Sequence, residues 1–398
     1  MTSLRSVRLR DVVLRPQTWN PGNAAADERF QYIDLASIDH QTKSLEAPRD
    51  VECGSAPSRA RQLVREGDVL VSTVRPNLNA VAVVPLELES ATASTGFCVL
   101  RPIRGRLDSR YLFHWVRTPS FVAAMVKRAT GASYPAVSDR VVLDSSLPLV
   151  DLTEQRRVAG ILDLADRLKE RRLRAMDDLR QLRESIAFEM FGDPVRNSKG
   201  WPDGRALGEV AEVVSGVTLG RKVHGSATRK IKYLAVVNVQ DQRLDLSTVK
   251  TIQATDVEIE RYRLLQGDLL LTEGGDPDKL GRGCLWSGEL PDCIHQNHIF
   301  RVRVHSADVT PQYLNWLVGS PRGKSYFLRS AKQTTGIASI NSRQLHAFPL
   351  LLPPLQLQKE FGTTLGRLVT IGEQMTASRC ELDRLFASLQ HRAFCGDL

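Results

Sequence analysis

The sequence predicts an α+β protein with two tandem globular domains, each followed by a long α-helix. Three observations predict this fold class: a repeat of about half the chain, short strand-like segments in each half, and a long helical pattern that closes each half. The chain has 398 residues, 42% of them hydrophobic and 25% charged, which is enough apolar sequence for two or three packed cores.

The repeat consists of short landmarks that recur in the same order in both halves. The Gly-Asp dipeptide at 67–68 returns at 267–268, each time before a run of apolar residues. The other matches are 9–12 with 207–210, 32–35 with 233–236, 130–131 with 335–336 and 147–149 with 348–350. The offset between partners stays between 198 and 205 residues. Such a constant order indicates the duplication of a domain-sized unit.

Within each half, short apolar segments are separated by Gly, Pro, Asn and Asp, which is typical of short strands and tight turns. The predicted strands include 69–74, 80–85 and 97–102 in the first half and 232–237, 268–272 and 298–304 in the second. Short helices are predicted at 109–118 and 311–319. We therefore expect one compact α+β domain at 1–150 and a second at 206–352, without a prediction of strand order.

A long helix is predicted at 151–192, followed by a linker at 193–205. Asp151 and Glu154 have the spacing of a capping box, and Gly192 with Pro194 is a typical helix end. The apolar positions expected to pack against another helix are Ile161, Leu168, Leu179 and Ile186. The basic run at 167–174 could face DNA phosphates, but a solvated helix flank is the favoured interpretation.

A second long helix is predicted at 353–398, beginning at the proline pair 353–354. Its packing positions are expected to be Phe361, Leu368, Met375 and Leu382. Two matched helices, each after one copy of the repeat, favour packing of one helix on the other. The alternative that each helix packs only on its own domain stays open.

The sequence lacks the motifs of common enzymes. There is no Gly-x-Gly-x-x-Gly loop, no acidic residue two positions before a lysine, and no Asp/Asn-Pro-Pro-aromatic segment. Residues 319–325 resemble a phosphate-binding loop but are one residue too short, so we expect a helix-ending turn with exposed basic residues. Cys284, Cys293, His295 and His298 do not have zinc-ligand spacing. We expect a non-catalytic chain without a bound metal; a stand-alone enzyme with a non-local active site is the minor alternative.

The net charge indicates the class of partner, and the cysteines indicate the cellular compartment. A formal net charge of +9 favours a polyanion partner, most simply nucleic acid. The six cysteines are scattered and form no Cys-x-x-Cys pair, which is typical of a reducing compartment. Neither a signal peptide nor a membrane-spanning apolar run is visible, so we expect a cytoplasmic protein without membrane contact.

Three polar loops in each half lie beside a predicted strand, at matching positions but with different residues. Their side chains suit base edges and phosphate oxygens, although any single residue could simply be solvated. The predicted DNA contacts of the first half are Thr73, Arg75, Asn77, Asn79, Thr130, Ser133 and Tyr134, beside a further polar segment at 94–95. Those of the second half are Lys279, Arg282, Gln296, Asn297, His298, Lys332, Thr334 and Thr335.

Taken together, these segments resemble the DNA-specificity subunit of type I restriction-modification systems, over essentially the whole chain. The resemblance is carried by GDVLVSTVRPNL (67–78), GDLLLTEGGDPDKLGRG (267–283), CIHQNHIFRVRV (293–304) and MFGDPVRNSKGWP (190–202). The Thr-Gly loops and the proline-containing entries to both long helices add to it. No single motif is highly specific, but their duplicated order is.

The resemblance implies a circular arrangement in which two target-recognition domains each bind one half of a bipartite site in double-stranded DNA. The two helices would form an antiparallel coiled coil that sets the spacing and docks two adenine-methyltransferase subunits. Restriction (translocase) subunits would complete the complex. This chain would bind no cofactor itself, because S-adenosylmethionine, ATP and Mg²⁺ would belong to the partner subunits. The alternatives are a specificity chain of another DNA-modification or defence system, or a coiled-coil scaffold without sequence-specific DNA binding.

Overall fold

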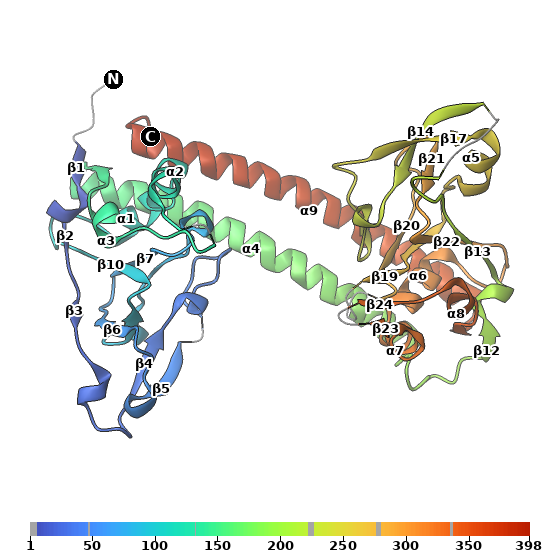
Figure 1. The fold of residues 1–398 in the computed structure, drawn as a ribbon, viewed down its shortest axis with the longest axis horizontal. Helices are drawn as coiled ribbons and strands as arrows, with labels where there is room; N and C mark the ends of the chain where they lie inside the picture. Colours follow the sequence, from blue (N-terminus) through green and yellow to red (C-terminus); the bar gives the residue numbers. More distant parts are fainter. Residues whose placement is uncertain (1–5, 47, 132, 222–226, 276–279, 335–336) are drawn as a thin grey trace. The chain divides into compact units, whose positions relative to one another are not determined.

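The computed structural model describes residues 6–46, 48–131, 133–221, 227–275, 280–334 and 337–398 (Figure 1). The chain forms two compact units. The first unit joins Met1–Met176 to Met375–Leu398, and the second consists of Asp177–Gln374. The division falls inside both long helices, α4 (Leu152–Phe191) and α9 (Leu355–Cys395), so each unit contains a part of both.

The first unit contains a four-stranded sheet of order β2-β10-β7-β8, a five-stranded sheet of order β3-β6-β9-β4-β5 and the pair β1-β11. Its strands are β1 (Ser6–Arg8), β2 (Val13–Leu14), β3 (Gln17–Thr18), β4 (Arg29–Ile33), β5 (Arg49–Glu52), β6 (Ala60–Leu63), β7 (Val69–Ser72), β8 (Val81–Val83), β9 (Thr92–Ser94), β10 (Phe97–Pro102) and β11 (Ser146–Pro148). Its short helices are α1 (Ser109–Trp115), α2 (Pro119–Arg128) and α3 (Asp139–Leu143). All these strand pairs are antiparallel except β4 with β9.

The second unit repeats this pattern with a four-stranded sheet of order β13-β22-β18-β20. Its other sheets are β17-β14-β21, β12-β25, β15-β16 and β19-β24-β23. Its strands are β12 (Asp203–Ala206), β13 (Ala211–Ser215), β14 (Thr228–Leu234), β15 (Val239–Gln240), β16 (Arg243–Leu244), β17 (Lys250–Thr255), β18 (Leu269–Thr272), β19 (Gly274–Gly275), β20 (Gly283–Leu285), β21 (Cys293–His295), β22 (Ile299–Val304), β23 (Lys332–Thr334), β24 (Ile337–Ser339) and β25 (Pro349–Leu351).

The short helices of the second unit are α5 (Asp256–Tyr262), α6 (Pro311–Gly319), α7 (Pro321–Ser330) and α8 (Ser342–His346). The 3-10 turns along the chain are η1 (Leu9–Asp11), η2 (Pro21–Asn23), η3 (Leu35–Ser37), η4 (Cys53–Ser55), η5 (Pro76–Leu78), η6 (Leu86–Leu88), η7 (Leu207–Glu209) and η8 (Val236–Asn238). The predicted strand at 97–102 and helix at 311–319 are confirmed to the residue, but the predicted strand at 232–237 ends at Leu234. Asn238 explains that early end, because its side-chain oxygen accepts from Ala235 N (2.8 Å) and stabilises η8.

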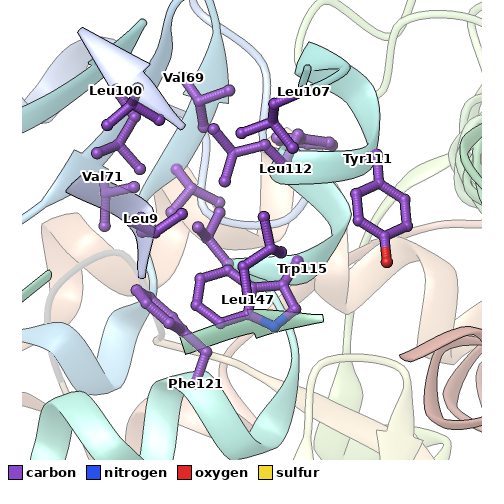
Figure 2. Close-up of a cluster of buried hydrophobic side chains, with 14 of the residues drawn as sticks. Leu9, Val69, Val71, Leu100, Leu107, Tyr111, Leu112, Trp115, Phe121 and Leu147 are labelled. Atoms are coloured by element: carbon purple, nitrogen blue, oxygen red, sulfur yellow. The ribbon is translucent and has the colours of Figure 1, made fainter. Parts of the chain in front are cut away.

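The central strand of each four-stranded sheet is buried on both faces, which explains why its sequence is continuously apolar. In β7, Val69 and Val71 lie in the core beside α1, whereas Leu70 lies in the core between the sheets. Figure 2 shows the first of these cores, around Tyr111 and Trp115. In β18 of the second unit the same alternation places Leu269 and Leu271 on one side and Leu270 on the other. Each such fully buried side chain stabilises the fold by about 1.5–3 kcal/mol relative to an exposed one.

The repeated Gly-Asp dipeptide has the same structural role in both units. Gly67 and Gly267 have φ angles of +81° and +92°, a conformation that glycine adopts without steric cost. The carboxylate of Asp68 then accepts two hydrogen bonds from Arg101, at 2.9 and 2.7 Å. Asp268 accepts the equivalent pair from Arg303, both at 2.7 Å. The dipeptide is therefore a turn followed by a buried ion pair across the sheet.

A buried glutamine joins the start of each long helix to the domain before it. Gln155 Nε2 donates to the carbonyl oxygens of Arg106 and Val150, and its Oε1 accepts from Asp108 N. In the second unit, the side chain of Gln358 makes the same three hydrogen bonds, to Asp308 O, Pro353 O and Thr310 N. The start of each helix is thereby tied to the backbone just before α1 or α6.

The structure has α4 within one residue of its predicted ends, whereas α9 (Leu355–Cys395) is shorter than the predicted 353–398. The carboxylate of Asp151 accepts from Glu154 N (3.0 Å), as a helix cap does. Gly192 ends α4 with a φ angle of +76°, and a Cβ atom there would lie 2.4 Å from the Ser198 hydroxyl. At about 1.5 Å per residue, the 40 residues of α4 give a rod of about 60 Å. Within the described residues, no helix carries a stretch long and apolar enough to cross a membrane.

Both long helices contribute to the packing within each unit. In the first unit, Phe386 and Ala393 of α9 share a core with Leu162 and Ala165 of α4. The first-unit ion pair between Lys169 Nζ and Asp383 Oδ1 (2.8 Å) also joins the two helices. In the second unit, the shared core is made by residues Ala187, Phe191, Phe361 and Leu365.

The predicted packing positions need one correction. Leu168 is 42% exposed, because the buried face of α4 runs through Leu162 and Ala165 instead; Ile161 is half-buried, like several of the other predicted positions. Leu179 lies beside Gly372 of α9, since a Cβ atom on that glycine would lie 3.5 Å from Leu179 Cδ2. Of the other predicted positions, Phe361 and Leu368 are buried, and Ile186, Met375 and Leu382 are half-buried.

The junction of each domain with its long helix differs between the units. In the first, the side chain of His114 on α1 is fully buried, and its Nε2 lies 2.7 Å from Asp163 Oδ1 of α4. Arg110 also binds Asp163 (2.5–3.1 Å), and Arg117 binds Asp166. Burial lowers the pKa of His114 despite the hydrogen bond with Asp163. Burial alone would raise the pKa of Asp163, but the bonds from His114 and Arg110 bring it down to about 2.

The second unit has aromatic rings at this junction. Trp316 of α6, at the position that corresponds to His114, packs on Phe191 of α4 with ring centroids 5.0 Å apart. Phe191 also contacts Tyr313 (4.8 Å) and Phe361 (4.9 Å). Gly366 stands where the first unit has Asp163, so this junction has no counterpart of that carboxylate.

Candidate nucleic-acid interface

Polar loops from three separate parts of the chain meet in the first unit. This first loop cluster consists of the described residues 73–79, 94–96, 130–131 and 133–137. Thr73 N donates to the carbonyl oxygen of Gly96 (2.9 Å), and Val137 N donates to that of Thr73 (2.9 Å). Arg75 N donates to the carbonyl oxygen of Pro135 (2.7 Å). These backbone bonds bring together the segments that the sequence predicts as DNA contacts.

Two predicted DNA contacts in this cluster have a structural role instead. Thr73 is only 7% exposed, and its hydroxyl donates to the carbonyl oxygen of Gly96 (2.9 Å). The side chain of Asn79 donates to the carbonyl oxygen of Val116 (3.0 Å). Both side chains satisfy backbone acceptors within the fold, so we remove them from the candidate contacts. The predicted residues that remain on the surface are Arg75, Asn77, Thr130, Ser133 and Tyr134.

Arg75 and Tyr134 come together on this surface although they are far apart in the sequence. The guanidinium carbon of Arg75 lies 4.7 Å from the centroid of the Tyr134 ring. Tyr134 is 68% exposed, which is unusual for a large aromatic side chain in a folded domain. The first loop cluster therefore presents a cation stacked on an aromatic ring to solvent.

The second unit gathers its polar loops through the same backbone hydrogen bonds. This second loop cluster consists of the described residues 272–275, 280–282, 296–298, 332–334 and 337–341. Glu273 N donates to the carbonyl oxygen of His298 (3.0 Å), and Ile340 N donates to that of Glu273 (2.9 Å). Strand β19 pairs with β24, which joins the first loop to the last. Thr272 N donates to the carbonyl oxygen of Arg282 (3.0 Å).

The side chains of the second loop cluster include the half-buried carboxylate of Glu273 as well as hydrogen-bond donors. His298 Nδ1 lies 2.5 Å from Glu273 Oε2, and its Nε2 lies 3.5 Å from the side-chain nitrogen of Asn297. Gln296 is tied into the sheet through its backbone N, which donates to Leu234 O (3.0 Å). Glu273 was not among the predicted contacts; its place within a predicted loop was the signal that could have included it. A carboxylate can accept a hydrogen bond from the cytosine amino group.

The remaining predictions for the second unit are only partly described. Lys279 and Thr335 lie outside the described residues. Lys332 and Thr334 form the ends of β23, but the structure describes only their backbone. Arg282 is a half-buried member of the cluster.

A shallow basic hollow of about 300 Å³ adjoins the second loop cluster. Arg243, Arg282 and Lys324 line it, with Asp241 at the same rim. Three cations beside one carboxylate favour the binding of an anion. The hollow therefore suits the phosphate backbone of a nucleic acid rather than a base edge.

The segment that resembles a phosphate-binding loop has a packing role. A turn ends α6 at Gly319, as predicted, but α7 begins again at Pro321. Gly323 is buried in α7, where a Cβ atom would lie 1.9 Å from the carbonyl oxygen of Val318. The prediction of exposed basic residues is wrong for Arg322, whose guanidinium is bound by Asp203 (2.9 and 3.0 Å).

The cysteines and histidines near β21 are buried structural groups. His295 has no exposed surface, and its Nδ1 bonds to the carbonyl oxygen of Ile299 (3.0 Å). Burial lowers the pKa of His295 to about 4 and raises the pKa values of Cys284 and Cys293 to about 12, so all three are neutral at pH 7. All six cysteines are free thiols. Among the described residues, no group of histidines, cysteines and carboxylates could hold a metal ion.

Curated relatives match most of the chain, although no family model matches it. The chain is 22% identical over 326 residues to the type I restriction enzyme EcoKI specificity subunit of Escherichia coli strain K12, covering 76% of this chain and 68% of the relative. It is 20% identical over 342 residues to the EcoBI specificity subunit of Escherichia coli, with coverages of 78% and 70%. A putative MjaX specificity subunit of Methanocaldococcus jannaschii is 25% identical over 170 residues, 40% of each chain.

Solved structures share the fold over the full length. A chain from a study of complex assembly and conformational transition of the type I restriction-modification system superposes with a TM-score of 0.64 at 24% identity, covering 100% of this chain and 99% of that one. The type I restriction-modification S subunit from M. genitalium superposes with a TM-score of 0.56 at 11% identity, covering 99% and 97%. The agreement extends over both units and both long helices.

Proposed function

The chain is a homologue of the type I restriction enzyme specificity subunits, and we propose that it recognises one bipartite sequence in double-stranded DNA for a complex of that kind. The first loop cluster would bind one half of the site and the second loop cluster the other half. No catalytic step is assigned to this chain. The cofactors S-adenosylmethionine, ATP and Mg²⁺ would be bound by partner subunits.

One observation carries this proposal: the two loop clusters have the same backbone hydrogen bonds and different exposed side chains. The bond from Thr73 N to Gly96 O recurs as the bond from Glu273 N to His298 O. The duplicated backbone gives each cluster the same geometry relative to its sheet. The divergent side chains then present different donors and acceptors, as two different half-sites require.

The long helices support a spacing role. In the first unit the beginning of α4 packs with the end of α9, and in the second unit the end of α4 packs with the beginning of α9. These contacts favour an antiparallel coiled coil between two target-recognition domains, in a circular arrangement. A rigid helical spacer suits half-sites separated by about one turn of DNA, roughly 34 Å. The two long helices would dock two adenine-methyltransferase subunits, and restriction subunits would join them.

A methylation experiment tests the proposal. The full chain is assembled with an adenine-methyltransferase partner, and methylated adenines are mapped on genomic DNA by sequencing. We expect one bipartite motif, and exchange of residues 206–352 for those of a relative should change one half of the motif only. A sequence-independent methylation pattern, or a change in both halves, contradicts the proposal.

DNA binding by the same complex separates the proposal from a coiled-coil scaffold without specific DNA contacts. Specific binding is expected to exceed non-specific binding by about 10³-fold or more at physiological salt. A scaffold would show no such difference between a duplex that contains the mapped motif and one that does not.

A further inference from the structure

The stacked pair of Arg75 and Tyr134 is the most organised feature of the first loop cluster. The guanidinium of Arg75 is exposed, and among the described residues no carboxylate binds it. Tyr134 makes no contribution to a core, because 68% of its surface is open to solvent. The fold therefore leaves this cation and this ring free for a ligand.

The backbone holds both residues in an arrangement that has a steric cost. Arg75 adopts a left-handed conformation (φ +49°), which costs a non-glycine residue about 1 kcal/mol or more. Its backbone N donates to the carbonyl oxygen of Pro135, next to Tyr134. On the other side, Gly131 (φ +100°) lets the chain turn so closely that a Cβ atom there would lie 2.9 Å from Tyr134 O. Both loops are thus fixed relative to each other.

Stacking on the ring restricts the guanidinium while its N–H donors stay available. A phosphate contact needs only a positive charge in reach, which a flexible lysine or arginine supplies without such restriction. A base edge requires two donors at fixed positions. The N–H fork of arginine matches O6 and N7 of guanine in the major groove, the commonest specific contact between proteins and DNA.

Among the described residues of the second unit, no equivalent cation–ring pair is found. In the shared hydrogen-bond pattern Thr73 corresponds to Glu273, so the position of Arg75 corresponds to Gly275. Val137 corresponds to Ile340 in the same way, so the position of Tyr134 corresponds to Ile337. The contact made by this pair belongs to one half of the DNA site only.

We propose that Arg75, held in place by Tyr134, binds O6 and N7 of one guanine in the half-site recognised by the first unit. This inference rests on the proposed function and adds the identity of a base to it. Tyr134 is a positioning residue, because it acts through Arg75.

The test uses the methyltransferase complex with its mapped motif. The half-site of the first unit is the one that stays unchanged when residues 206–352 are exchanged. Each guanine in that half is replaced in turn by 7-deazaguanine, which lacks the N7 acceptor. At one position we expect the methylation rate to fall about 10-fold or more, and Arg75→Lys should remove the discrimination at that base pair alone. Tyr134→Phe should keep the discrimination, whereas Tyr134→Ala should relax it.

The results that would overturn this inference can be told apart from a failure of the proposed function. Arg140→Lys, at an exposed arginine of the same unit, should leave every base preference unchanged. A first half-site without guanine, or full discrimination by Arg75→Lys, overturns the inference. If Arg75→Gln, which removes the charge, lowers the affinity equally for all sequences and reduces the salt dependence by about one ion, Arg75 contacts a phosphate, which also overturns the inference. If no bipartite motif is found at all, the proposed function itself fails.

Discussion

The first unit joins its domain to α4 through charged groups, whereas the second joins its domain to Phe191 of α4 and Phe361 of α9 through aromatic rings. His114 and Asp163 occupy the place that Trp316 and Gly366 occupy in the second unit. The three hydrogen bonds from a buried glutamine to the backbone are nevertheless the same at both junctions, as Gln155 and Gln358 show.

This difference shows which interactions a duplicated domain retains. A glutamine that satisfies backbone groups can be replaced only at the cost of buried unpaired atoms, so its role is repeated in both copies. Packing between side chains can change more freely than these hydrogen bonds, because one well-packed group of side chains can replace another. The same distinction holds for the two loop clusters, where the backbone bonds agree and the exposed side chains differ.

The largest effect is expected from the aromatic junction. Phe191→Ala should destabilise the second unit by about 3–5 kcal/mol, because it removes a ring that contacts Tyr313, Trp316 and Phe361. The corresponding Phe394→Ala in the first unit should cost about half as much, since Phe394 is only half-buried. Urea unfolding followed by circular dichroism measures both. Equal losses would contradict the idea that the two junctions depend on different interactions.

The buried ion pairs come next. Asp68→Asn leaves Arg101 without its carboxylate partner in a buried site, and we expect a loss of about 3 kcal/mol. Asp268→Asn should cost about 2 kcal/mol, because Arg303 is more exposed than Arg101 and water screens it better. Asp177→Asn on the exposed face of α4 is the matched control and should change little. A similar loss in the control would show that helix charge, not the ion pair, is responsible.

The buried histidines predict how stability depends on pH. Burial lowers the pKa of His295 to about 4, whereas an unfolded histidine takes up a proton near pH 6.5. Acidification from pH 6.5 to 4 therefore favours the unfolded state, by about 1.4 kcal/mol per pH unit. Hydrogen exchange of the β21 amides measures this slope. His295→Gln should flatten it, and the exposed His305→Gln should not; an unchanged slope in His295→Gln would exclude this histidine as the cause.

The sequence predicted the elements whose signals are local. The cap at Asp151, the stop at Gly192 and the boundaries of α6 all depend on residues within one helical turn. The buried face of α4 could not be predicted in the same way, because Leu162 and Leu168 are equally apolar in sequence. Only the neighbouring domain decides that Leu162 is buried and Leu168 exposed.

Within the loop clusters, the sequence identified the segments but not the role of each side chain. Thr73 is of a residue type that often contacts DNA, yet its hydroxyl donates to the carbonyl oxygen of Gly96, a residue from another loop. The stacking of Arg75 on Tyr134 depends in the same way on a contact between segments far apart in the sequence. Such contacts follow from the strand order, which the sequence did not reveal.

The smallest effect concerns the carboxylate of the second loop cluster, which contrasts with the cation of the first. Glu273→Gln should reduce discrimination at one base pair of the second half-site by about five-fold. The change replaces a carboxylate, which lies 2.5 Å from His298 and can accept a hydrogen bond from the cytosine amino group, by an amide. The same change should raise non-specific affinity, since it removes a negative charge that repels phosphates. Binding measured against salt concentration, with matched and mismatched duplexes, separates the two effects.

Arg75→Lys provides the opposite case, because it keeps the charge and should leave non-specific affinity unchanged while discrimination at one base pair of the first half-site is lost. Glu260→Gln, at an exposed carboxylate elsewhere in the second unit, is the control for a general effect of charge. If Glu273→Gln raises non-specific affinity no more than this control does, Glu273 does not face the DNA backbone. The second unit would then recognise its half-site through the other side chains of its loop cluster.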